Sequence, residues 1–367
     1  MNKQIYIFAI TFFLSYTVKG TTDSTQYYYQ EAYNKIIAML NGTEAISFKD
    51  AVFHVENAYT DNQLSYSLFD AQIKTLSQVV RKVAQANEDN FVYDYKDRLK
   101  ILYHASLFHV MTDTVNFIFG TDTTVNKHLP FTYDFFDIQG KNDWTKMFVT
   151  KLLFSKEGNC HSLPYLYKIL AENLELETHL ALAPNHMYIK HRSEKTGMYN
   201  TELTSAAFPI DAWLMTSGYI HLNAIESGIY MQALDDKQSL ALCLIDLAQG
   251  YQKKSGKTDD EFIMKCCETA LQYHPNYINA LLLKAEIFKS RFDKHLKANN
   301  VEHATQVFHI PEAKQLFEDY ETLIVQIHQL GYRKMPEKMY LDWLLELKEN
   351  QEKYLNKEII NNLNISN

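Results

Sequence analysis

Apolar residues recur at helical spacing through the first third of the chain. Between residues 69 and 83 they are separated by four, three, four and three positions, which places them on one face of an amphipathic helix. Ser47 precedes the apolar run that begins at Phe48, and a serine in that place is a typical N-cap. We therefore predict a helical N-terminal region over residues 21–120, in which packing explains the pattern. The clearest stripe consists of Phe69, Ile73, Leu76, Val80 and Val83.

The pattern changes between residues 121 and 233. Apolar residues from 163 to 174 recur every three or four positions, which predicts a buried helix that begins at or just after Cys160. Three short runs typical of β-strands follow, at 178–183, 187–191 and 199–203. A helix followed by a strand meander predicts an α+β fold class for the core over residues 121–233.

From residue 234 the chain returns to helical spacing. Helices are predicted at 262–273 and 277–289, and Pro275 between them suits the first turn of the second helix. With small residues at Ala270 and Ala280, this pair resembles a tetratricopeptide repeat, in which small side chains let antiparallel helices approach closely. We expect this tetratricopeptide-like region to cover residues 234–300, with one clear repeat and a degenerate one before it.

Further helices are predicted in the C-terminal segment, residues 301–367. They cover residues 311–329 and 336–354. We interpret the apolar stripe of the last helix as packing rather than as a groove for a partner. This stripe consists of Met339, Tyr340, Trp343, Leu344 and Leu347.

The first twenty residues have the pattern of a secretory signal peptide. Lys3 precedes an apolar run over residues 5–16, and small or short residues follow before Thr21. The run is too short to span a bilayer comfortably, and no second run of about 18 apolar residues occurs. We expect residues 1–20 to be cleaved and the mature protein to be exported, periplasmic or extracellular, without a membrane span. An uncleaved anchor or a buried N-terminal helix is the alternative.

Composition excludes several classes of protein. Lys and Arg total 36 against 44 Asp and Glu, a net charge of −8 with no basic block, so nucleic acid is not an expected partner. Four cysteines in 367 residues do not form a disulfide scaffold. The fourteen histidines show no zinc-ligand spacing, and no glycine-rich phosphate loop occurs, so we expect no metal and no cofactor.

Three residues far apart in the chain have the chemistry of a thiol catalyst. Cys160 begins a predicted helix, where backbone N–H groups and the helix dipole stabilise a thiolate. His186 begins one predicted strand, and Glu202 lies on the next. Adjacent antiparallel strands can place the imidazole and the carboxylate side by side, and the helix can direct the sulfur at the imidazole. This is the arrangement of nucleophile, base and orienting group that thiol catalysis requires.

The motif from Gly158 to Ser162 (Gly-Asn-Cys-His-Ser), followed by a strand histidine and then Glu-Leu-Thr at residues 202–204, resembles the transglutaminase-like superfamily. The resemblance implies Cys160 as nucleophile, His186 as base and Glu202 as the acidic partner. Where this chain has Glu202, the family usually has aspartate. Asn200 is the alternative group to orient the histidine, and His161 is a supporting or capping group beside the thiol.

Two functions from different classes follow. The first is a peptidase, amidase or acyl transferase that acts on a peptide or protein substrate through Cys160. The second is a protein-interaction module, in which the core is inert and the helical repeat binds a partner, as in members of the superfamily whose cores are not known to be catalytic. A single clear repeat weakens the second, because about three are needed for a stable stack. The absence of a glutamine shortly before Cys160, which would donate to an oxyanion, weakens the first.

Overall fold

The computed structural model describes residues 22–118, 125–258 and 260–349, and helices make up 59% of the structure. Small parallel and antiparallel sheets accompany the helices, so the fold is α+β and mostly helical. The predicted signal peptide lies outside the described residues, as do residues 350–354 of the last predicted helix. Within the described ranges, no helix has the length and apolar character needed to cross a membrane.

Helices dominate the N-terminal region, as predicted. The Ser47 hydroxyl accepts a hydrogen bond from the Asp50 N–H at 3.2 Å, which confirms Ser47 as an N-cap. All five residues of the stripe between positions 69 and 83 are buried. The helical region ends at Thr112 rather than near residue 120, because the backbone turns extended at Asp113. The helices are α1 (Thr22–Leu40), α2 (Phe48–Tyr59), α3 (Tyr66–Asn87) and α4 (Arg98–Thr112).

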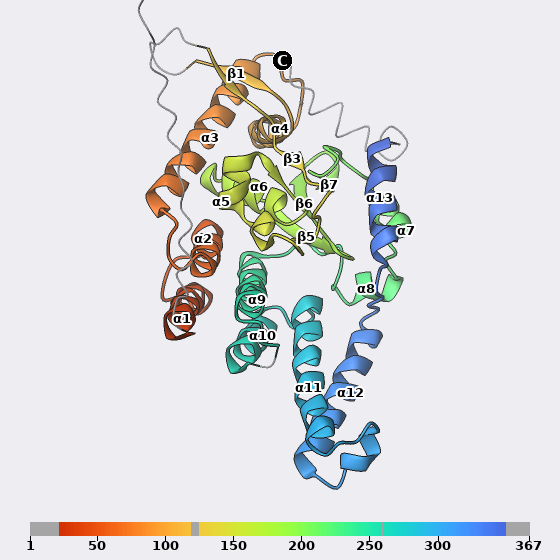
Figure 1. Ribbon diagram of the computed structural model, residues 1–367. Helices are drawn as coiled ribbons and strands as arrows, with labels where there is room; N and C mark the ends of the chain where they lie inside the picture. The colour runs from red at the N-terminus through yellow and green to blue at the C-terminus, as the bar shows by residue number, and fades with distance from the viewer. Residues whose placement is uncertain (1–21, 119–124, 259, 350–367) are drawn as a thin grey trace, which may run out of the picture.

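The central region packs a helix against a three-stranded antiparallel sheet in the order β5-β6-β7 (Figure 1). Helix α6 (Ser162–Asn173) begins two residues after Cys160. The strands are β5 (His179–Ala183), β6 (His186–Ser193) and β7 (Gly197–Thr201). Because β7 ends at Thr201, Glu202 lies just beyond the strand, in an isolated bridge with Ala207, and not within the predicted strand 199–203.

Shorter elements surround this sheet. Strand β1 pairs antiparallel with β2, and β3 pairs parallel with β4, which brings the segment before α5 next to the turn that carries Cys160. These elements are β1 (Val115–Phe117), β2 (Asn126–His128), β3 (Thr132–Tyr133), the 3-10 helix η1 (Trp144–Met147), α5 (Val149–Ser155) and β4 (Glu157–Gly158).

The C-terminal helices include the predicted antiparallel pair. Tyr277 caps α11 with an extended backbone, so Pro275 lies in the connection before the helix rather than in its first turn. Helix α12 packs against α11. Helix α13 then lies beside α7 near the sheet (Figure 1). The elements are α7 (Asp211–Ser217), α8 (Leu222–Glu226), α9 (Asp236–Ser255), α10 (Glu261–Tyr273), α11 (Ile278–Ala298), η2 (Ala304–Val307), α12 (Pro311–Gln329) and α13 (Glu337–Glu349).

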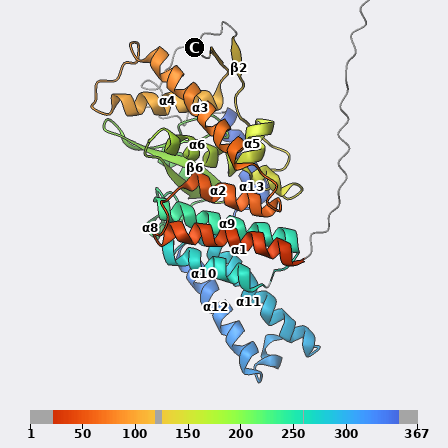
Figure 2. The same cartoon turned by 90° about the vertical axis from the view of Figure 1, so that its left-hand side faces the viewer.

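Helix α9 connects the N-terminal helices with the helices that follow it. It packs against α1 and α2 on one side and α10 on the other, and Figure 2 shows α1, α9 and α10 side by side. The rings of Tyr29 and Tyr251 meet edge to face at 5.1 Å, and the hydroxyls of Tyr33 and Thr269 lie 2.8 Å apart. One hydrophobic core therefore runs from α1 through the central sheet to α13.

Candidate active site

Hydrogen bonds between the neighbours of Cys160 fix the turn before α6 that carries it. The Asn159 carboxamide oxygen accepts from the N–H groups of His161 and Ser162 at 3.0 and 3.1 Å. The Ser162 hydroxyl in return accepts from the Asn159 N–H at 3.1 Å. These bonds satisfy N–H groups that a helix start leaves open, so they fix the turn and with it the direction of the thiol.

Gly158 allows the turn to close. A Cβ atom at this position would lie 2.4 Å from the Ser162 hydroxyl oxygen and 2.9 Å from a methyl group of Leu152. Neither distance is compatible with a side chain. The glycine of the Gly-Asn-Cys-His-Ser motif is thus required by packing, two residues before the sulfur.

His186 and Glu202 meet in a buried hydrogen bond. His186 is the first residue of β6, and its Nε2 bonds to one carboxylate oxygen of Glu202. The other carboxylate oxygen accepts from the Thr204 N–H at 2.8 Å and from the Thr204 hydroxyl at 2.5 Å. The bridge to Ala207 fixes the backbone of Glu202. Both oxygens are occupied, and the carboxylate can therefore remain ionised although it is 1% exposed.

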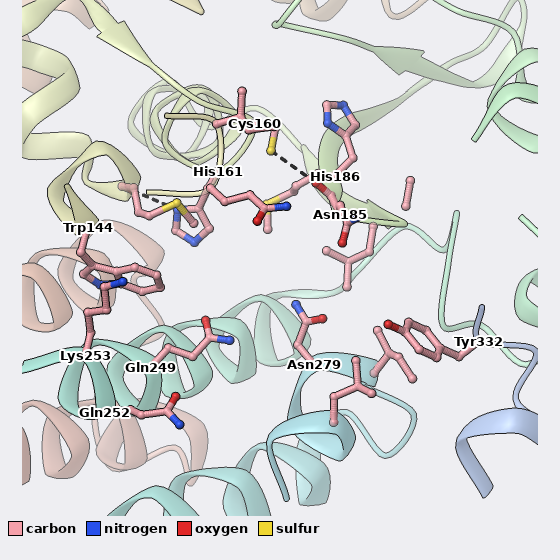
Figure 3. A pocket seen from close by; sticks show the side chains of 18 of the residues that line it. Trp144, Cys160, His161, Asn185, His186, Gln249, Gln252, Lys253, Asn279 and Tyr332 are labelled. Carbon is pink, nitrogen blue, oxygen red and sulfur yellow. Dashed lines mark hydrogen bonds between the residues drawn. The ribbon is translucent and has the colours of Figure 1, made fainter. Parts of the chain in front are cut away.

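The sulfur of Cys160 lies beside this pair. Its thiol donates to the Asn185 carbonyl oxygen at 3.7 Å, which holds it at the end of the β5–β6 hairpin. Burial raises the pKa of the Cys160 thiol, but the neighbouring His186 imidazole outweighs burial and the pKa lies below its ordinary value. Figure 3 shows the sulfur between the helix turn and the histidine.

Electrostatics favour the charged forms of all three groups. Burial alone would lower the pKa of His186, yet the Glu202 carboxylate and the thiol raise it to about 10. Burial raises the pKa of Glu202, and the imidazole reverses that effect, so its pKa is lowered. Each of the three groups is therefore shifted toward its charged form.

Asn200, the alternative partner of the histidine, is directed elsewhere. Its carboxamide N–H groups donate to the Pro209 carbonyl at 3.0 Å and to the Asp211 carboxylate at 2.7 Å. Since Glu202 holds the position at Nε2 of His186, Asn200 is not the group that orients the imidazole.

His161 links the turn before α6 to α9. Its Nδ1 bonds to the Met147 carbonyl at 2.9 Å, and its Nε2 lies 3.0 Å from the Asp246 carboxylate. Burial lowers the pKa of His161, but Asp246 outweighs burial and raises it. Helix spacing predicts that neighbouring residues face apart, yet both Cys160 and His161 line one pocket, because the turn is not yet helical.

The residues that surround the imidazole include a pair that the sequence pattern assigned to packing. The Tyr340 hydroxyl of α13 lies 3.1 Å from Nδ1 of His186. The ring of Trp343 meets the imidazole edge-on, with centroids 5.0 Å apart, and stacks on Trp213 at 5.3 Å. The His186 side chain is 0% exposed as a result. No local signal distinguishes these aromatics from core residues, since their spacing is that of any apolar helix face.

A pocket of about 660 Å³ opens in front of the thiol. Figure 3 shows it between the turn before α6 and the β5–β6 hairpin on one side and α9 and α11 on the other. Among the described residues that line it, Lys253 is cationic and none carries a carboxylate. Carboxamides and aromatic rings make up much of the wall: Gln139, Trp144, Asn185, Tyr230, Gln249, Gln252, Asn279 and Tyr332.

The remaining cysteines have a different environment. Burial raises the pKa of Cys243, Cys266 and Cys267, and all three are fully buried in helices. Across the described ranges, no group of three or more His, Cys, Asp or Glu side chains could hold a metal ion.

Comparison with known proteins found no match: no protein-family model matches the chain, nor does any curated protein or any solved structure.

Proposed function

We propose that this protein is an exported thiol-dependent amide hydrolase or acyl transferase with a transglutaminase-like core. Cys160 is the nucleophile, His186 the base and Glu202 the group that orients and charges the imidazole. The observation that carries the proposal is the buried bond between Nε2 of His186 and Glu202, with a thiol of lowered pKa beside the same ring and at the wall of a pocket. Tetratricopeptide-like helices supply the opposite wall.

The reaction follows from these roles. The Cys160 thiolate attacks the carbonyl carbon of an amide, and the carbon–sulfur bond forms as the carbon–nitrogen bond breaks. The departing amine takes up the proton that formation of the thiolate transferred to His186. Water then attacks the thioester, releases the acid and restores the thiol. The Cys160 N–H is the backbone donor that we assign to the developing oxyanion.

The pocket chemistry favours a peptide as substrate. Carboxamide side chains offer both a donor and an acceptor, which is the pattern that a peptide group requires. Figure 3 shows Gln249 and Asn279 across the pocket from His161 and Asn185, so a chain between the two walls can be bonded from both sides. With Lys253 in the wall and no carboxylate among its described residues, neutral or acidic peptides, including cell-wall-like material, fit better than basic ones.

One observation favours the second candidate function, a non-catalytic interaction module. The His186 side chain is 0% exposed, so a leaving amine in the pocket does not face the imidazole directly. In that case the buried triad serves stability, and the pocket between the core and α9 and α11 binds a partner peptide without cleaving it.

Thiol reactivity separates the two. We expect iodoacetamide to alkylate Cys160 rapidly at pH 6, and His186→Ala to slow this by at least about tenfold, because one unit of thiol pKa changes the thiolate fraction tenfold. Alkylation is followed by mass spectrometry of the Cys160 peptide. His221→Ala is the matched control, since His221 caps α8 and lies outside the pocket lining.

Turnover completes the test. Wild-type protein should release amines from a peptide mixture, and Cys160→Ala should not, with both proteins unfolding at similar temperatures. Slow alkylation that His186→Ala leaves unchanged, together with no turnover, contradicts the enzymatic proposal and leaves the interaction module.

A further inference from the structure

The hydroxyl of Tyr340 lies where the thiol and the imidazole meet. It is 3.1 Å from Nδ1 of His186 and 3.4 Å from the hydroxyl of Tyr133. It also interacts with the sulfur of Cys160. Tyr340 is 0% exposed, and none of the described side chains of α13 lines the pocket, so this hydroxyl contacts the reacting groups from the side away from the substrate.

The donors and acceptors around this hydroxyl can be assigned. Nε2 of His186 is bonded to Glu202, and the imidazolium therefore has its second proton at Nδ1, where it donates to the Tyr340 oxygen. The Tyr340 O–H proton is then free to point at the sulfur of Cys160. Burial keeps the tyrosine neutral by raising its pKa well above the ordinary value. The chain from imidazolium through tyrosine to thiolate has one donor at every step.

We propose that Tyr340 is a catalytic residue, which bridges Nδ1 of His186 and the sulfur of Cys160 and stabilises their charge-separated pair. The proposal rests on the proposed function and deepens it. When the pair forms, the thiol proton passes to the tyrosine oxygen as the tyrosine proton passes to Nδ1. The net result is a thiolate and an imidazolium, with the tyrosine neutral before and after.

The C-terminal helix is built to hold this hydroxyl. Trp343, one turn beyond Tyr340, stacks on Trp213 with an angle of 18° between the rings. The Asn185 carboxamide donates to the Met335 carbonyl at 3.2 Å, which ties the segment before α13 to the hairpin that places the sulfur. The active site therefore requires residues from both the central region and the last described helix.

If α13 instead blocked the imidazole, the expected change in the reactivity of Cys160 would have the opposite sign. If α13 were a cover that blocks Nδ1, removing the hydroxyl would free the imidazole, and Cys160 would react faster. If Tyr340 bridges the pair, removing the hydroxyl leaves the thiolate with one donor fewer, and Cys160 reacts more slowly. The sign of the change decides between them.

Tyr340→Phe in the full-length protein is the test, because it keeps the ring and removes only the oxygen. We expect the midpoint of the pH profile for alkylation by iodoacetamide to rise by about one unit, and the rate at pH 6 to fall about tenfold. The charged or titratable groups that face Cys160 are His186, His161, Tyr133 and Tyr340, so the profile is read as that of the cluster.

Two further variants keep the test specific. Tyr29→Phe removes a buried hydroxyl between α1 and α9 that is not part of the pocket lining, and it should leave the profile unchanged. Tyr133→Phe removes the hydroxyl that contacts Tyr340 and should shift the midpoint in the same direction but by less. A merely structural role for Tyr340 would lower the melting temperature without moving the midpoint.

The outcomes are distinguishable from those of the proposed function. If His186→Ala slows alkylation and Tyr340→Phe leaves the midpoint in place or accelerates the reaction, the bridge is wrong and the triad stands. If His186→Ala has no effect, the triad itself fails, whatever Tyr340→Phe does.

Discussion

Strand β6 buries two histidines, with opposite consequences. At the first residue, His186 bonds to Glu202 and its pKa rises to about 10. Five residues later, His191 faces His104 of α4, with ring centroids 4.1 Å apart, and burial lowers the pKa of both imidazoles. Since both histidines are buried, burial by itself does not decide whether an imidazole is charged. The presence of a buried carboxylate decides it.

The largest effect should come from removing that carboxylate. Glu202→Gln leaves the His186 imidazole without an anionic partner, and losing one partner of a buried ion pair destabilises a protein by about 3–5 kcal/mol. Urea unfolding at pH 7 measures the loss. In the same variant, Cys160 should be alkylated far more slowly at pH 6, because a neutral imidazole does not stabilise the thiolate.

The double variant His186→Gln with Glu202→Gln sharpens this test. Two carboxamides can bond to each other and leave neither position without its buried partner, so the double variant should be more stable than Glu202→Gln alone. If the losses in unfolding free energy of the two single variants simply add, His186 and Glu202 are not coupled. The explanation given for the raised pKa of His186 is then wrong.

The second effect concerns the pair formed by His191 and His104, whose contribution to stability depends on pH. Burial lowers the pKa of His104 to about 3, so the unfolded chain, with a histidine pKa near 6.5, binds more protons between these values. The stability from the neutral imidazole is therefore complete above pH 6.5 and falls as the pH drops. By pH 5 the loss is roughly 2 kcal/mol for His104. His186 has the reverse sign: its contribution is complete below pH 6.5 and is lost as pH rises through about 10.

Urea titrations from pH 7 to pH 4 check this. His104→Phe should reduce the slope of stability against pH in that range, because one titrating group is gone from the core. His303→Phe, at an exposed position before η2, is the matched control and should keep the wild-type slope. An unchanged slope in His104→Phe would show that protonation of other groups causes the loss of stability at low pH.

The smallest effect is expected at Asn200, which lies on β7 between the two histidines. Asn200→Ala removes hydrogen bonds to Pro209 and Asp211, at a cost of about 1 kcal/mol. Because Glu202 orients His186, the pH profile of Cys160 alkylation should not move. A shifted profile would show that Asn200 also acts on His186 and would contradict the assignment of that role to Glu202 alone.

Several features of the fold follow from local pattern. The stripe from residue 69 to 83 is buried because helical spacing and apolar chemistry agree at every position. The Ser47 cap needs only the residues that follow it. The strand ends are less local: Glu202 lies beyond β7 because its backbone pairs with Ala207, a contact that the strand-like run at 199–203 does not encode.

For the site, Cys160, His186 and Glu202 could be chosen as candidates without coordinates, because a thiol at a helix start and polar residues near strand ends are visible in the order of the residues. The packed fold was needed to show that Glu202 rather than Asn200 meets the imidazole, that α9 and α11 form a wall of the pocket, and that Tyr340 reaches Nδ1 from 154 residues away. The physical reason is that periodicity fixes which face of an element is buried. The partner of a buried polar atom depends on how distant elements dock, and that is set by the packing of the whole core.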